Sequence, residues 1–172
     1  QRRLMTIHEE SNVFNIAVEG NFDDCQNLVK AMFNDEEFSK EINMSGVNSI
    51  NWARIIAQSV YYFYAYFKVG KDQPLSFCVP TGNFGDIYAG YLAKKLGLPI
   101  DKLIVATNKN DILHRAISGG DYTQKKVEET NTPSMDIQIA SNFERLLYDV
   151  KDCNSEITKD VMSKIKKNTY KI

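Results

Sequence analysis

The sequence has little of what marks several functional classes. Its three cysteines, Cys25, Cys78 and Cys153, lie far apart and form no C-x-x-C pair. Neither a disulfide framework nor a zinc site is therefore expected, and a reducing, cytoplasmic location is favoured. Basic residues number 21 against 22 acidic ones, so the clustered basic excess of a nucleic-acid-binding protein is missing. The most apolar stretch, residues 55–67, is shorter than the roughly 20 residues of a membrane span, so neither nucleic acid nor membrane is an expected partner.

The composition that remains is ordinary for a globular domain. Apolar residues make up 43% of the chain and charged residues 25%, which is close to the average for such proteins. A chain of 172 residues is long enough to bury a substantial core. The sequence starts with Gln1 inside what reads as the end of an element, so we expect it to be a piece of a longer protein.

Strand-like and helix-like segments alternate through the first two thirds of the chain. Runs of β-branched and aromatic residues between turn residues predict strands, and apolar residues three and four positions apart predict helices. The predicted strands are 12–20, 75–80 and 102–107, and the predicted helices are 25–33, 48–68 and 87–96. Asn21 and Asp23 supply acceptors for the first helix, and the acidic pair Asp23–Asp24 is expected to open that helix rather than to bind a metal.

This alternation predicts βαβ units with a mostly parallel sheet in a three-layer α/β/α fold. Beyond Gly120 the pattern weakens into a polar loop over 119–135 and two amphipathic helices over 141–150 and 155–167. We therefore expect a parallel α/β core over 1–118, followed over 119–172 by a polar loop and peripheral helices of the same domain.

The helix over 48–68 has an apolar face with residues at helical spacing, which we expect to face the core. That face comprises Ile50, Ala53, Ile56, Ala57, Val60, Tyr61 and Tyr64. The aromatic run 61–64 could form a stacking platform for bases. Because its rings point in different directions around a helix, we interpret it instead as core together with a subunit contact.

The segment Pro80-Thr81-Gly82-Asn83-Phe84-Gly85-Asp86 joins a buried strand to the start of a helix. Such a junction directs several free backbone N–H groups the same way, at the positive end of the helix dipole, and is suited to bind a phosphate dianion. Gly82 and Gly85 let the backbone approach the phosphate without a Cβ in the way, and Asn83 can add a side-chain donor. The alternative is a tight βα turn without a ligand.

Known phosphate motifs do not fit this loop. No Gly-Lys-Ser/Thr follows, as a Walker motif requires, and its glycines are too far apart for the dinucleotide G-x-G-x-x-G. With the following Ala-Gly-Tyr-Leu-Ala-Lys-Lys-Leu-Gly-Leu-Pro, the loop instead resembles the cofactor-phosphate loop of threonine synthases, which belong to the fold type II pyridoxal-phosphate (PLP) enzymes. Three further segments resemble the same family in the same order: 18–26, 48–54 and 106–111. The resemblance covers about residues 1–150.

The resemblance implies roles for individual residues. The PLP phosphate would be held, mostly through backbone N–H groups, by Gly82, Asn83, Phe84, Gly85 and Asp86. The Asp86 carboxylate, unfavourable beside a phosphate, is expected to cap or pair with another group. Second-rank contacts at a helix start facing the cofactor would be Asn48, Ser49 and Asn51, against the alternative that they only cap the helix.

The resemblance also implies an activity that this chain does not complete by itself. The full enzyme would convert O-phospho-L-homoserine and water to L-threonine and phosphate, with PLP as cofactor. The Schiff-base lysine and the substrate-phosphate loop, both expected upstream, do not occur in residues 1–172, and Lys94 and Lys95 lie past the phosphate loop. We therefore expect no catalytic residue in this chain, a need for the remainder of its own chain, and assembly as a homodimer.

Two other functions stay open from the residues alone. One is a sibling PLP-dependent lyase, such as a dehydratase or a threonine synthase-like protein. The other is a non-catalytic α/β module that holds a phosphate-bearing ligand. His114, after the last predicted strand, has no partner motif nearby and is expected to be a structural or surface residue.

Overall fold

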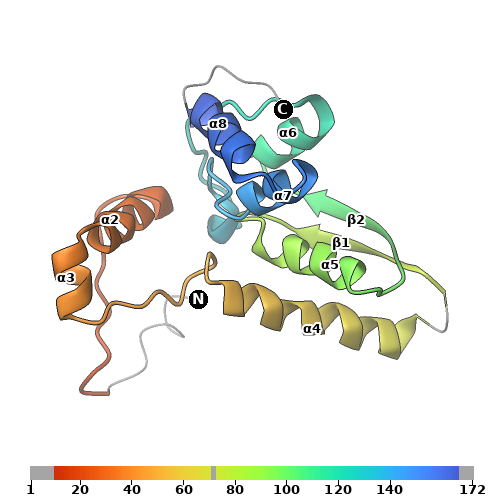
Figure 1. Cartoon of the computed structure of the whole chain (residues 1–172), viewed down its shortest axis with the longest axis horizontal. Coiled ribbons are helices and arrows are strands. Elements are labelled where there is room, and N and C mark those ends of the chain that lie inside the picture. The colour runs from red at the N-terminus through yellow and green to blue at the C-terminus, as the bar shows by residue number, and fades with distance from the viewer. Residues whose placement is uncertain (1–9, 71–72, 167–172) are drawn as a thin grey trace. The chain divides into compact units, whose positions relative to one another are not determined.

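The computed structural model describes residues 10–70 and 73–166 (Figure 1). Its contacts divide the chain into two compact units, Gln1–Met44 and Ser45–Ile172, which are described separately below. Within the described residues no helix combines the length and the apolarity that a membrane crossing needs.

The first unit contains helices α2 (Phe22–Asn34) and α3 (Glu36–Glu41). The Asn21 side chain accepts hydrogen bonds from the N–H groups of Asp23 at 2.8 Å and Asp24 at 3.2 Å. The Asp24 carboxylate in turn accepts from the Asn21 N–H at 2.8 Å, which completes a capping box. The predicted helix and the helix-opening role of the acidic pair are therefore confirmed, with a start three residues earlier than predicted.

The strand predicted over 12–20 is wrong. These residues form a turn and irregular backbone, and all of them are exposed, including Phe14 at 81% and Ile16 at 85%. β-Branched and aromatic residues stabilise a strand through packing against cross-strand neighbours rather than through a strong backbone preference. No described segment pairs with 12–20, so these residues have no cross-strand neighbours that would stabilise a strand.

The second unit begins with the predicted helix and βαβ unit. Helix α4 (Trp52–Val69) precedes strand β1 (Leu75–Pro80), helix α5 (Gly85–Lys95) and strand β2 (Ile100–Ala106). The strands pair in parallel, from Leu75 with Ile100 to Pro80 with Ala106. The mixed α/β class with a parallel sheet is therefore as predicted, and α5 is the crossover that a parallel pair requires.

Helices α4 and α5 cover one face of this sheet. The Tyr62 ring of α4 meets the Phe77 ring of β1 edge-on, with 4.9 Å between centroids. Gly90 of α5 lies in this contact, where a Cβ would come within 2.6 Å of the Tyr62 ring and 3.0 Å of Leu103. The absence of a side chain at Gly90 therefore permits the close approach of α4, α5 and the sheet.

The face of α4 that packs against α5 and the sheet differs from the predicted one. Ile55, Ser59 and Tyr62 are buried, whereas most of the predicted face is exposed, including Val60 at 59% and Tyr64 at 64%. Both sides of this helix are apolar, so helical spacing alone does not indicate which side meets the core. Cys78 of β1 is likewise exposed, because described elements cover only the other face of its strand.

The rest of the second unit contains α6 (Ile112–Gly119), the 3₁₀ turn η1 (Pro133–Met135), α7 (Phe143–Val150) and α8 (Ser155–Lys166). In Figure 1, α6, α7 and α8 lie above the two strands and α4 lies below them. The last two helices were predicted within two residues of these bounds, although residue 167 lies outside the described residues, whereas the loop predicted over 119–135 extends to residue 142. The predicted division at residues 118–119 stays a prediction.

A polar network holds the loop between α6 and α7 against the end of β2. The Asp136 carboxylate accepts from the Thr130 hydroxyl at 2.6 Å, the Asn108 amide at 2.7 Å and the Asn110 amide at 3.2 Å. These bonds, that from Thr130 foremost, hold the pKa of Asp136 below its ordinary value. The buried Asn110 side chain also donates to the Glu128 carbonyl oxygen at 2.8 Å and accepts from the Glu128 N–H at 2.9 Å. Backbone that lacks regular structure is thus fixed by side chains.

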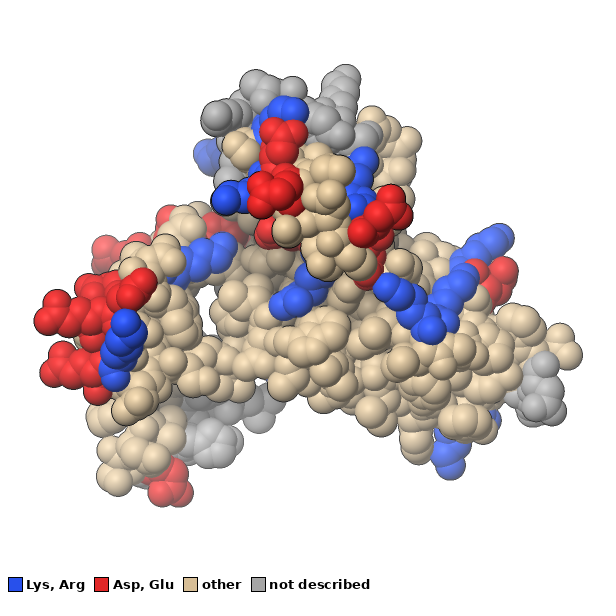
Figure 2. Space-filling view, viewed as in Figure 1, with Lys and Arg blue, Asp and Glu red and all other residues tan. Residues whose placement is uncertain are grey.

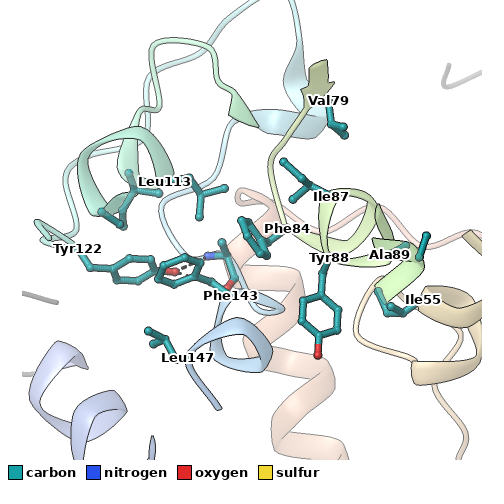
Figure 3. Packing of buried hydrophobic residues seen from close by; sticks show 14 of the residues in the cluster. Ile55, Val79, Phe84, Ile87, Tyr88, Ala89, Leu113, Tyr122, Phe143 and Leu147 are labelled. Carbon is teal, nitrogen blue, oxygen red and sulfur yellow. Dashed lines mark hydrogen bonds between the residues drawn. The ribbon is translucent and has the colours of Figure 1, made fainter. Parts of the chain in front are cut away.

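The core of the second unit contains a set of stacked and edge-on aromatic rings (Figure 3). Phe84, just before α5, is 4% exposed and meets the Phe143 ring edge-on at 5.2 Å. Tyr122 stacks on the other side of Phe143, also at 5.2 Å. Phe84 adopts φ 64°, a left-handed conformation that costs about 1–2 kcal/mol for a residue with a Cβ, so aromatic burial offsets backbone strain at this position.

We expect Phe84→Ala to destabilise the complete protein by about 3–5 kcal/mol, because a buried ring is lost. Phe84→Gly loses the same ring but relieves the left-handed strain, so it should be about 1 kcal/mol less destabilising than Phe84→Ala. Urea unfolding of both variants measures the difference. An alanine variant as stable as the glycine variant would show that the strain at this position is absent.

Candidate functional site

The predicted phosphate loop lies where the carboxyl ends of both strands meet the start of α5. The Thr81 N–H donates to the Ala106 carbonyl at 2.8 Å, which ties the loop to β2. From Gly82 to Ile87, no backbone N–H donates a hydrogen bond to any other described residue. The first N–H groups of a helix have no intrahelical partner, and here they lie at the positive end of a helix dipole. The geometry therefore suits an anionic ligand.

Gly82 lies in a confined position within this loop. A Cβ on Gly82 would come within 3.2 Å of both the Met135 Cα atom and the Ser134 carbonyl oxygen. These atoms belong to η1, which the Asp136 network holds in place. A Cβ at this distance would force the loop or η1 to shift by a few tenths of an ångström, so the glycine is favoured by close approach rather than by a special backbone angle.

The Asn83 side chain is fixed at both ends. Its Nδ2 donates to the Ser49 hydroxyl at 2.6 Å, and its Oδ1 accepts from the Ser141 N–H at 3.0 Å. The oxygen and one amide hydrogen are therefore used in bonds that orient the loop. The expected side-chain donation to a ligand is limited to the second hydrogen on Nδ2.

The Asp86 side chain is directed to α4. This agrees with the expectation that its carboxylate pairs with a group other than the ligand. The Tyr62 hydroxyl lies 3.2 Å from the Asp86 Oδ1 atom and 2.9 Å from its carbonyl oxygen. Burial raises the pKa of the Asp86 carboxyl, and the bond from Tyr62 opposes that rise. Burial also raises the pKa of Tyr62, as does the nearby charge of Asp86, so Tyr62 remains the donor.

The three residues predicted as second-rank contacts have different positions. Ser49 touches the loop directly through Asn83. Asn51 caps α4, accepting from the Ala53 N–H at 2.9 Å and donating to the Gly46 carbonyl at 2.6 Å. Asn48 accepts from the Ile50 N–H at 3.2 Å within the turn before the helix. The capping alternative therefore describes Asn51, while Ser49 is the one of the three that the structure brings to the loop.

Sequence reasoning missed the residues that hold the loop from α7. Asn142 is completely buried, and its Nδ2 donates to the carbonyl oxygens of Ser49 at 2.9 Å and Asn83 at 3.1 Å. Arg145 donates to the Asn142 Oδ1 at 3.0 Å and to the Ile50 carbonyl at 2.8 Å. The sequence places Asn142 in the first turn of the helix predicted over 141–150, and nothing in that position indicates a contact with a distant loop.

The other titratable candidates lie away from the loop. Lys94 and Lys95 are in the last turn of α5, where Lys94 donates to the Asp101 carbonyl at 3.0 Å and Lys95 pairs with Asp149 at 2.9 Å. His114 is exposed on α6. Among the described residues no three His, Cys, Asp or Glu side chains are grouped so as to hold a metal ion.

Known proteins resemble this chain in sequence and in structure. A threonine synthase from Pseudomonas aeruginosa is 53% identical over 167 residues, which are 96% of this chain and 36% of that protein. A threonine synthase from Saccharomyces cerevisiae is 55% identical over 152 residues, covering 86% of this chain and 30% of that protein. No protein-family model matches the chain.

The fold agrees with a solved structure of the same kind. A PLP-bound threonine synthase from Brucella melitensis matches with a TM-score of 0.87 and 55% identity, over 99% of this chain and 37% of that one. This chain therefore spans roughly a third of the length of the relatives it matches. On this identity in sequence and fold, the chain belongs to the threonine synthase family and corresponds to one segment of such an enzyme.

Proposed function

We propose that the complete protein converts O-phospho-L-homoserine and water to L-threonine and phosphate, and that this chain holds the phosphate of PLP. The observation that carries the proposal is the run of unpaired N–H groups from Gly82 to Ile87 at the start of α5. A phosphate dianion accepts such donors strongly. The Brucella melitensis relative contains PLP on the matching fold, which supports PLP as the ligand here.

The residues present fit the cofactor phosphate. The Asp86 carboxylate, the one acidic group in the loop, is engaged by Tyr62 on α4, so it is held by a partner other than the ligand. Because residue 82 is a glycine, no side chain lies between the loop backbone and η1. When bound, PLP would supply an electron sink for carbanion chemistry, while the protein supplies orientation and proton transfer.

We propose that the remainder of the enzyme covers the exposed face of the β1–β2 sheet. Parallel sheets are normally covered on both faces, yet Cys78 of β1 and Ile104 of β2 are exposed, Ile104 by 46%. We assign this face to other parts of the same protein. All three cysteines are free, which supports a cytoplasmic location. Recovery of the protein from a secreted or periplasmic fraction would contradict that location.

The complete protein should release phosphate from O-phospho-L-homoserine in the presence of PLP, and the 172-residue chain alone should release none. The reason is that no lysine among the described residues bonds to the loop, with Lys94 and Lys95 engaged at the other end of α5. A phosphate assay with chromatographic detection of threonine tests both statements. Binding of PLP by the full protein without phosphate release would favour a sibling lyase, and turnover by the chain alone would disprove the fragment interpretation.

Gly82→Ala should weaken PLP binding by the complete protein about tenfold or more, because the new Cβ forces the loop away from η1 and misplaces charge-assisted donors. Gly119→Ala is the matched control, since nothing lies within 4 Å of a Cβ there. Titration of PLP by protein fluorescence gives both affinities. Equal affinities for Gly82→Ala and wild type would remove this loop from the cofactor site.

We also propose that the complete protein is a homodimer in which the outer face of α4 contributes to the subunit contact. Val60, Tyr61, Tyr64 and Phe67 on this face are exposed by 59%, 65%, 64% and 78%. In Figure 2 the surface over α4 is mostly uncharged. Apolar patches of this kind mark protein contacts.

Phe67→Asp should convert that dimer to a monomer that still binds PLP, as measured by light scattering coupled to size-exclusion chromatography. Tyr148→Asp on α7, where the native ring is 40% exposed, should leave the assembly unchanged. A dimer that survives Phe67→Asp would contradict the contact. A variant that no longer folds would also contradict it, because α4 would then be covered by the protein's own chain.

A further inference from the structure

Asn142 occupies a central position among the groups that hold the phosphate loop. It lies immediately before α7, is 0% exposed, and uses every polar atom of its side chain. Its backbone N–H and its Nδ2 both donate to the Asn83 carbonyl oxygen, each at 3.1 Å. The same Nδ2 also donates to the Ser49 carbonyl at 2.9 Å. Three segments that are distant in sequence therefore meet at one amide group.

Arg145 determines which way round the Asn142 amide lies. A guanidinium group only donates hydrogen bonds, so the atom of Asn142 that faces its Nε at 3.0 Å must be the oxygen. The amide nitrogen is thereby directed to the two carbonyl groups. Arg145 is itself held by the Ile50 carbonyl at 2.8 Å and by the Trp52 ring, 5.1 Å from its guanidinium carbon.

The bonds to the Asn83 carbonyl have a direct consequence for the next N–H group. The peptide between Asn83 and Phe84 is planar and trans, so its N–H points opposite to its C=O. Because Asn142 holds the C=O toward α7, the Phe84 N–H is turned away from α7. It is one of the donors in the unpaired run from Gly82 to Ile87.

The orientation of this peptide opposes the local preference of the chain. Phe84 has φ 64°, and a half-turn of the Asn83–Phe84 peptide would move that angle by roughly 180°, into the region that residues with a Cβ prefer. The same rotation would break both bonds to the Asn83 carbonyl and turn the Phe84 N–H toward α7. The contacts with Asn142, together with the packing of Phe84 on Phe143 (Figure 3), are what prevent it.

We propose that Asn142 is a positioning residue that keeps the Asn83–Phe84 peptide turned so that its N–H faces the cofactor phosphate. Arg145 assists by orienting the Asn142 amide. This inference rests on the proposed role of the loop and deepens it, because it names a residue outside the loop on which phosphate recognition depends. Asn142 itself does not touch the ligand.

The test compares PLP with pyridoxal, which lacks the phosphate, in the complete protein. For wild type, PLP should bind far more tightly than pyridoxal. The measured quantity is the dissociation constant for pyridoxal divided by that for PLP. In Asn142→Ala this ratio should fall about tenfold or more, which is the effect of losing one charge-assisted bond to the phosphate. Affinity for pyridoxal should change little, whereas general loosening of the fold would weaken both ligands alike.

Two further variants make the result decisive. Thr158→Val is the control, since it removes a buried hydroxyl bonded to the Asn154 carbonyl at 2.7 Å in α8, away from the loop; its ligand ratio should equal that of wild type. Arg145→Met leaves Asn142 in place but removes the donor that orients it, and it should lower the ratio in the same direction. It also serves if Asn142→Ala does not fold.

An unchanged ratio in both Asn142→Ala and Arg145→Met would overturn the positioning role while leaving the proposed function intact. Equal loss of affinity for PLP and pyridoxal would likewise overturn it, because that pattern indicates general loosening. If wild type itself binds PLP no better than pyridoxal, the assignment of the loop to the cofactor phosphate is what fails. The three outcomes therefore separate the inference from the function on which it rests.

Discussion

The site depends on the docking of Asn83 and Phe84 onto the first turn of α7. Two adjacent loop residues make polar and aromatic contacts with two adjacent residues of that turn, Asn142 and Phe143. The partners Asn83 and Asn142 are 59 positions apart in sequence. The polar pair orients a peptide, and the aromatic pair buries the ring of a residue in left-handed conformation. Together they preserve a loop shape that local backbone preference alone would not maintain.

The two sides of the loop are held by different means. On one side, Asn142 and Ser49 bond to its carbonyl and amide groups. On the other side, η1 approaches Gly82 closely and is itself kept in place by the Asp136 network. Buried polar networks are stabilising only when their members are satisfied, and in this one each amide and carboxylate has partners.

Local chemistry made several features of the fold and the site predictable. The βα junction with its two glycines indicated an anion site because free N–H groups at a helix start follow from the helical hydrogen-bond pattern itself. Asn21 was identified as a helix-opening residue, and capping was the alternative considered for Asn51, because each bonds to N–H groups within three positions in sequence. Strands β1 and β2 were found because a short apolar run bounded by turn residues has few other interpretations.

Other features depended on contacts that a sequence pattern does not contain. Residues 12–20 have strand-like composition without a strand, because a strand exists only where another strand pairs with it. Helix α4 is apolar on two sides, and only its packing on α5 and β1 showed which side Ile55 and Tyr62 occupy. Asn142 lay inside a predicted helix, and only the structure showed that it supports the loop. The sequence by itself determined most of the helices, both strands and the βα junction that we propose as the anion site, since these follow from bonds between near neighbours. Tertiary structure alone decided which faces are buried and which distant residues hold the loop, because those energies arise between segments many residues apart.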